Sequence, residues 1–206
     1  MSAFVQHVRQ LLTEETVMSI GGSLTAMEEV IQQAVPLEAM DPQDDLHVPI
    51  HLMSIHRPAV ARTRGSAAHA DATALIPLDL PGQLPSGGTD FTTEMAAWAR
   101  SLADDARTPR LDDLHAPEGP AVGLLIVVGR RAFGPVEIRR QRVVLAVLAN
   151  GTVLRIVRSR GEAMVRRSRG TVVAARDELA AALWRIGQAL HAFPGDEPPL
   201  PTARPR

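Results

Sequence analysis

The sequence predicts an α+β fold in which an antiparallel β-sheet of three to five strands is covered by helices on one face. Three observations lead to this fold class. Residues 121–128 form a continuous apolar run, which is typical of a strand buried on both faces. Asn150-Gly151 separates two runs rich in β-forming residues and predicts a hairpin. Residues 177–193 then carry apolar side chains at helical spacing and predict a helix.

The Asn150-Gly151 pair also predicts the register of the hairpin. A two-residue type I′ turn, which needs positive φ at both central positions, would pair the two residues that flank it. Counting backwards from this turn places Arg142 and Arg158 on opposite faces of the sheet, at the end farthest from the turn. A register slip of one residue would change this assignment.

The N-terminal part of the chain predicts an N-terminal helical pair. Apolar side chains at helical spacing run from residue 3 to residue 18, and Gly21-Gly22 interrupts them. Thr25 and Glu28 have the spacing of a capping box and predict the start of a second helix, which runs to about Ala34. Two helices of this size cannot enclose a core alone, so we expect them to pack on another part of the protein.

Composition divides the chain into four segments. Residues 1–56 form an acidic helical segment, and residues 57–89 are rich in Ala, Gly and Pro and predict a linker or an extended arm. Residues 90–193 contain the α+β domain, and residues 194–206 predict a Pro-rich flexible tail. Short strands are also expected at residues 47–52, 75–80 and 162–167.

Several functional classes lack support in the sequence. The chain has no cysteine, which excludes disulfides and thiolate metal sites. We see no signal peptide and no apolar stretch of the roughly 18 residues that span a bilayer, so we expect a cytoplasmic protein without membrane contact. Gly129 and Gly134 match half of a phosphate loop, but the Lys-Ser/Thr pair is missing. We therefore expect no catalytic residues and no cofactor, and an enzyme is the least favoured class.

The distribution of charge is the most informative feature of the sequence. All 22 basic residues are arginine, and eleven of them lie in residues 130–169 beside two glutamates, a formal charge of +9. Residues 1–129 hold seven arginines and seventeen acidic residues, a formal charge of −10. Such a polarised chain predicts that its basic part meets either its own acidic part or an external anion.

The arginines expected at the open end of the hairpin are the candidate binding site for an anion or a partner, and we call them the arginine rim: Arg130, Arg131, Arg139, Arg140, Arg142, Arg158 and Arg160. Guanidinium groups bind carboxylates and phosphates bidentately. Carboxylates of the acidic N-terminal helices, or those at 104–105 and 112–113, would neutralise the rim within one chain or between subunits. A nucleic acid or phosphate ligand is the second interpretation, and solvated charge is the third.

Three histidines and two tryptophans are weaker candidates. His47, His51 and His56 lie close together in the sequence, but their spacing matches no metal signature, so we expect no metal site. Trp184 lies about 100° off the apolar stripe of its helix, given the helical step per residue. Because an exposed tryptophan often marks an interface, we assign Trp184, and with it Trp98, to an interface. The equal alternative for Trp184 is that it packs on the linker that crosses the sheet.

The favoured function is a non-enzymatic cytoplasmic interaction or accessory protein. It would self-associate, or dock a protein partner, through its acidic helices and the arginine rim, and we expect a homo-oligomer. The alternative is a nucleic-acid-binding regulator that uses the arginine cluster at residues 130–169.

Overall fold

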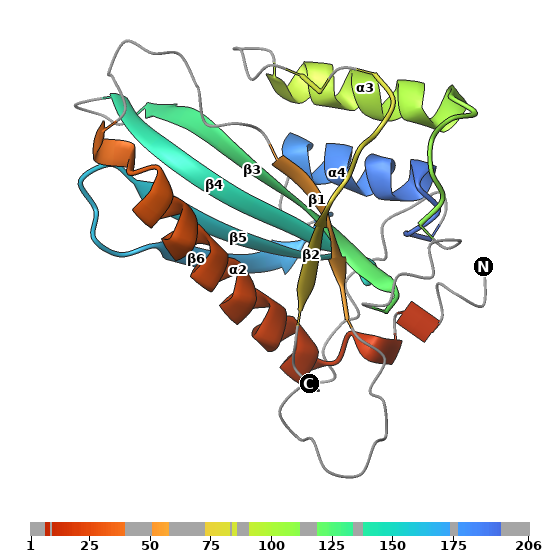
Figure 1. Cartoon of the computed structure of the whole chain (residues 1–206), viewed down its shortest axis with the longest axis horizontal. Coiled ribbons are helices and arrows are strands. Elements are labelled where there is room, and N and C mark those ends of the chain that lie inside the picture. The colour runs from red at the N-terminus through yellow and green to blue at the C-terminus, as the bar shows by residue number, and fades with distance from the viewer. Residues whose placement is uncertain are drawn as a thin grey trace.

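The computed structural model describes residues 7–8, 10–39, 51–57, 73–82, 84–85, 91–111, 119–133, 138–173 and 177–194. Its centre is a six-stranded antiparallel sheet with the strand order β2-β1-β3-β4-β5-β6 (Figure 1). The strands are β1 (His51–His56), β2 (Ala74–Pro77), β3 (Ala121–Phe133), β4 (Ile138–Leu148), β5 (Thr152–Ser159) and β6 (Arg166–Thr171). The predicted α+β class with an antiparallel sheet is confirmed, and the sheet has more strands than the three to five expected.

The helices are α2 (Glu14–Ala34), α3 (Phe91–Asp104) and α4 (Glu178–Ala189), and a 3-10 turn, η1 (Leu37–Ala39), follows α2. They cover both faces of the sheet, whereas the sequence predicted helices on one face (Figure 1). Helix α2 lies across one face, and α4 packs on β3 and β4 from the other face, with α3 against α4. The reason is that residues 121–128 and 143–148 are buried on both faces, so each face needs an apolar cover.

Helix α2 corrects the prediction of a helical pair that breaks at Gly21-Gly22. Residues 7–8 and 10–11 are helical, but the helix that follows runs through both glycines without interruption. It begins at the N-cap Thr13, whose Oγ1 accepts from the Thr16 N–H at 3.2 Å. Burial of an apolar stripe on the sheet outweighs the helix propensity that the two glycines lose, about 1 kcal/mol each.

The hairpin of β4 and β5 forms where Asn150-Gly151 predicts it, but its register differs by one residue. Among the described residues outside glycine, positive φ occurs only at His191, so Asn150 does not adopt the type I′ conformation, while Gly151 has a φ of 82°. The Gly151 N–H donates to the Leu148 carbonyl at 2.8 Å. The turn therefore has one left-handed residue, the glycine, where a type I′ turn has two, and the loop is one residue longer.

The consequence of this register is that Arg142 lies directly opposite Arg158, on the same face of the sheet. The predicted placement on opposite faces is therefore wrong. Arg155, three residues before Arg158, points to the other face because side chains alternate along a strand. There it forms an ion pair with Asp177, the N-cap of α4.

The sheet joins strands from three of the four segments that composition suggested. β1 comes from residues 1–56 and pairs with β3, and β2 comes from residues 57–89 and forms the edge beside β1. Residues 58–72 and the tail from 195 onward lie outside the described part of the chain. The predicted strand at 162–167 corresponds to β6, which begins at Arg166.

Candidate functional site

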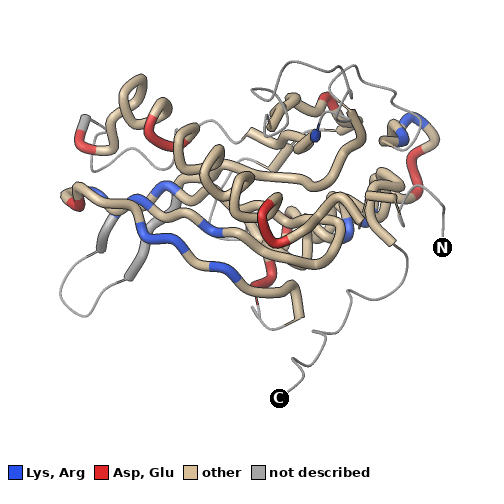
Figure 2. Tube along the Cα trace, turned by 90° about the horizontal axis from the view of Figure 1, so that it is seen from below, with Lys and Arg blue, Asp and Glu red and all other residues tan. Residues whose placement is uncertain are grey.

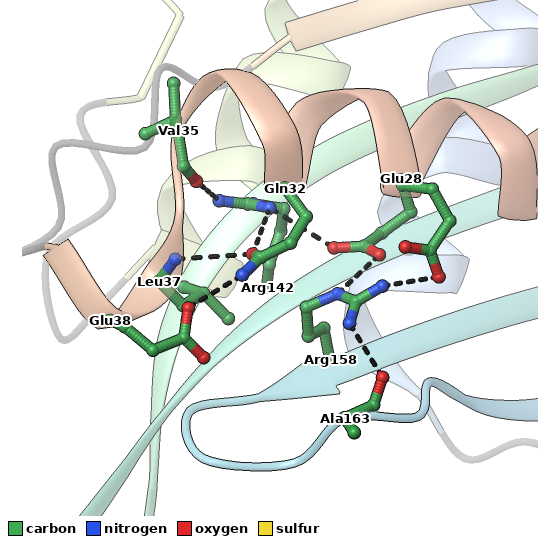
Figure 3. A network of polar contacts seen from close by, with 9 residues as sticks. Glu28, Gln32, Val35, Leu37, Glu38, Arg142, Arg158 and Ala163 are labelled. Carbon is green, nitrogen blue, oxygen red and sulfur yellow. Dashed lines mark hydrogen bonds and ion pairs between the residues drawn. The ribbon is translucent and has the colours of Figure 1, made fainter.

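Two arginines and one glutamate form a buried cluster between α2 and the sheet (Figure 3). β4 and β5 place Arg142 beside Arg158, and α2 crosses above them with Glu28 on its inner face. The position of Glu28 follows from the helix, because Ile20, Leu24 and Glu28 repeat at four-residue steps along the buried stripe. The cluster therefore depends on the hairpin register and on an uninterrupted α2.

Glu28 bridges the two guanidinium groups. Its Oε1 accepts from Arg142 Nη1 at 3.2 Å, and its Oε2 accepts from Arg158 Nε at 2.7 Å. The side chains of Glu28 and Arg142 are 0% exposed, and that of Arg158 is 5% exposed. Both carboxylate oxygens are thus used, each by a different strand of the sheet.

Further acceptors on α2, at its end and between β5 and β6 receive other guanidinium protons. Arg142 also donates to Gln32 Oε1 at 3.2 Å and to the Val35 carbonyl, where α2 ends. Arg158 donates to the Ala163 carbonyl at 3.2 Å and forms an ion pair with Glu29 Oε1 at 2.6 Å.

The Arg142 Nε is buried and makes no hydrogen bond to the described residues. The cluster therefore balances two cations with Glu28 and Glu29, and almost every polar atom of the buried arginines has a partner.

The environment acts on the two arginines in different ways. Burial lowers the pKa of Arg142, and the charge of Glu28 opposes this effect. Burial also acts to lower the pKa of Arg158, but hydrogen bonds and charge from Glu28 and Glu29 outweigh it and raise the pKa. Both side chains remain cationic at neutral pH, because the pKa of an arginine starts above 12.

The other basic residues near the cluster also have partners within the chain. Arg160 donates to the Glu38 carbonyl at 3.2 Å, and Arg169 pairs with Glu14 at the start of α2. Arg166 pairs with Glu162. Figure 2 shows acidic positions along α2 above the strands that carry the basic positions.

The structure brings only part of the predicted arginine rim together. Arg142, Arg158 and Arg160 meet α2 and the turn that follows it. Arg140 is half-buried on β4. The side chains of Arg130, Arg131 and Arg139 lie outside the described residues.

Glu28 is the residue of the cluster that the sequence analysis missed. Its spacing from Thr25 was interpreted as a capping box, but Thr25 lies inside α2 and its Oγ1 donates to the Gly21 carbonyl at 2.9 Å. Of the two acidic pairs predicted as partners of the rim, residues 112–113 lie outside the described part of the chain. Asp105 instead binds Arg107 at 2.7 Å, and hydrogen bonds from Arg107 lower the pKa of Asp105 to about 2. The sequence does contain a signal for the role of Glu28. Glu28 stands at the next four-residue step of an apolar helical stripe, which indicates a buried glutamate.

The histidine candidates do not gather into a metal site within the described residues. His47 lies outside them, and His51 is exposed on β1. His56 is buried, and both ring nitrogens are in use: Nε2 lies 2.8 Å from Ser54 Oγ, and Nδ1 lies 2.8 Å from the Gly119 carbonyl oxygen. His56 therefore ties β1 to the segment before β3.

The two tryptophans contact the protein itself. Trp184 was expected to be exposed, but it is 3% exposed and stacks on Phe193 with the ring centroids 4.9 Å apart. Gly187 makes room for this Phe193 ring, since a Cβ there would come within 2.1 Å of it. Trp98 is half-buried on α3 and donates its Nε1–H to the Pro81 carbonyl at 3.2 Å.

Comparisons with known proteins supply no further assignment: no family model, no curated protein and no solved structure matches this chain. A search of the described helices finds none with the length and apolar character needed to cross a membrane.

Proposed function

We propose that this chain is a non-enzymatic interaction or accessory protein that docks a protein partner, which is either a second copy or another protein. One observation supports the proposal most. In the described part of residues 130–169, Arg142, Arg155 and Arg158 form ion pairs with carboxylates of the same chain. In the sequence the arginines of this segment suggest an external anion as ligand. In the structure these three instead bind carboxylates of the same chain.

The buried position of the cluster strengthens this argument. A phosphate group needs guanidinium protons at an accessible surface, and Arg142 and Arg158 direct theirs at Glu28, Gln32 and carbonyl oxygens beneath α2. Displacing Glu28 from two buried cations would leave charges unpaired in a poorly solvated site, which is strongly unfavourable. Their role is therefore to hold α2 on the sheet, and the surface that remains is available for a partner.

The nucleic-acid-binding alternative depends on a different group of residues. Arg166, Arg167 and Arg169 are exposed on β6. Fluorescence anisotropy with random duplex and single-stranded probes at low salt tests this alternative. We expect no binding at micromolar protein. Micromolar binding that falls steeply between about 50 and 200 mM salt, as counterion release requires, would overturn the proposal.

Self-association is tested by size-exclusion chromatography with light scattering at low and high salt. A defined oligomer that loosens in high salt would show that the partner is a second copy held by charge. A monomer at both salt concentrations would contradict self-association and count against the proposal.

A further inference from the structure

Strand β6 is an edge of the sheet with an open side. It is the last strand in the order, and among the described residues no strand pairs with its outer side. Residues 166–169 are exposed and 170–171 are half-buried. An edge of this kind presents unpaired backbone N–H and C=O groups, which can pair with an additional strand.

The hydrogen bonds with β5 show which backbone groups are open. The Val172 N–H donates to the Gly151 carbonyl at 3.0 Å, and the register pairs Arg167 with Ile156. Because bonded and non-bonded pairs alternate in an antiparallel ladder, Ser168 bonds to β5. The backbone groups of Arg167 and Arg169 therefore point to the open side.

The same strand carries three arginines, and its pairs with acidic residues are weak. Arg166 and Arg169 pair with Glu162 and Glu14, and all four side chains are at least 23% exposed. Exposed pairs of this kind contribute about 0–1 kcal/mol. Arg169 binds both carboxylate oxygens of Glu14, which is the stronger, bidentate geometry, so Arg166 and Arg167 are the arginines most available to a partner. Arg167 is exposed and forms no ion pair with the described residues.

The placement of these arginines suits a strand more than a flat polyanion. Arg167 and Arg169 share the α2 face, and Arg166 lies on the α4 face. Side chains of an added strand point alternately to the two faces of the sheet, so they would reach the arginines on both faces. A nucleic-acid backbone would contact the arginines on one face of the sheet only. A second β6 is a poor partner because arginines would meet arginines across the new pair.

We propose that the open edge of β6 receives an extended acidic segment of another protein by strand addition. This inference rests on the proposed interaction function and specifies the partner's chemistry. Main-chain hydrogen bonds to the open groups of Arg167 and Arg169 would supply affinity, and acidic side chains facing the three arginines would supply selectivity. The partner segment would contain glutamate or aspartate at alternating or successive positions and would lack proline.

The test measures anisotropy of labelled peptides with the full-length chain. One peptide alternates glutamate and valine, so that all its glutamates lie on one face of the added strand, beside Arg167 and Arg169, and a second has the same side chains with N-methylated backbone amides. We expect the first to bind and the N-methylated peptide to bind at least about tenfold more weakly, a loss of about 1.4 kcal/mol. Equal binding of the two peptides would overturn strand addition, because charge alone would then explain the binding.

Variants locate the site on β6. Arg167→Gln should weaken binding about fivefold because it removes one cation, as for an exposed ion pair. Arg167→Pro should weaken binding further, because it also removes a backbone donor on the open side while the ladder with β5 is kept. Arg100→Gln, an exposed arginine on α3, is the matched control and should leave binding unchanged. Circular dichroism of each variant verifies the fold, and equal effects of Arg100→Gln and Arg167→Gln would overturn the site.

The remaining outcomes separate this inference from the proposed function. If neither peptide nor oligonucleotide binds, the edge arginines only protect the edge from pairing, and the inference fails while the interaction function stands. If an oligonucleotide binds and Arg167→Gln weakens it, both the inference and the proposed function fail.

Discussion

Glu28 is the residue on which the candidate site depends most. Removing two guanidinium groups and a carboxylate from water costs several kcal/mol per ion, and only good geometry with full hydrogen bonding repays this cost. The contacts of Glu28 with both arginines, at 3.2 and 2.7 Å, supply much of this bonding, while the Arg142 Nε makes no hydrogen bond to the described residues. The cluster is therefore sensitive to the loss of a single member.

We expect Glu28→Gln to lower the free energy of unfolding by about 3–5 kcal/mol, because it leaves two buried cations with one half-exposed carboxylate. Urea denaturation followed by circular dichroism measures the change. The matched control is Glu29→Gln, which alters the neighbouring carboxylate, 50% exposed, and should cost less than about 1 kcal/mol. Similar losses in the two variants would show that Glu28 has no special role.

The ion pair of Asp105 with Arg107 predicts how the stability of the protein depends on pH. Hydrogen bonds from Arg107 lower the pKa of its carboxyl group from 3.8 to about 2. A lowered folded-state pKa stabilises the protein above pH 3.8, and this contribution is lost as the pH falls through about 2. Titration by NMR of the Asp105 carboxyl should show the low value, and Arg107→Gln should return it toward 3.8. An unchanged pKa in that variant would exclude the pair as the cause.

The partner of the buried arginines has no local signature in the sequence. The charge imbalance indicated that arginines would need partners, but it did not identify Glu28. Local spacing from Thr25 favoured a cap, while the tertiary contact with β4 and β5 decides the role of the side chain. Ion pairs more than 100 residues apart in the chain, such as Glu28 with Arg142, leave no local pattern.

At the scale of elements, two glycine motifs had opposite outcomes. Asn150-Gly151 marks a turn as predicted, but one positive φ instead of two gives a longer loop and shifts the register. Gly21-Gly22 was expected to end a helix and lies inside α2. Gly21-Gly22 stays helical because the flanking residues pack on the sheet, whereas Gly151 itself supplies the left-handed conformation of the turn.

The continuity of α2 is tested by Gly22→Ala. Gly22 is exposed, and a Cβ at this position meets no atom within 4 Å. In a helix interior the substitution should raise the free energy of unfolding by about 0.5–1 kcal/mol, since alanine has the higher helix propensity. The contrasting variant is Gly151→Ala, which should be destabilising because Gly151 has a φ of 82°. Destabilisation by Gly22→Ala in urea denaturation would indicate a break in α2.

At the scale of the whole molecule, the antiparallel sheet could be predicted from the sequence, but its number of strands could not. The buried strand at 121–128 and the hairpin were evident because apolar runs and turn residues are local signals. β1 and β2 join the same sheet from before α3, and pairing at such sequence separation has no local signature. The cover of both faces follows from the same apolar runs, which the one-face prediction did not take into account.

Among the described residues, carboxylates of the acidic part of the chain pair with arginines of the basic part. The acidic helix α2 meets the basic strands β4, β5 and β6 through Glu28, Glu29 and Glu14. An arrangement of this kind fixes the orientation of α2 on the sheet and removes the central arginines from contact with external anions. Among the described residues it leaves exposed arginines on β6, the edge where we propose that a partner docks.

A double-mutant cycle between Glu28 and Arg158 tests most directly whether the acidic helix neutralises the arginines. The free energy of unfolding is measured by urea denaturation for the parent, Glu28→Gln, Arg158→Gln and the double variant. We expect a coupling energy of about 2 kcal/mol, with the double variant less destabilised than the sum of the single variants. Effects that add to within about 0.5 kcal/mol would contradict the pairing and leave the arginines available for another ligand.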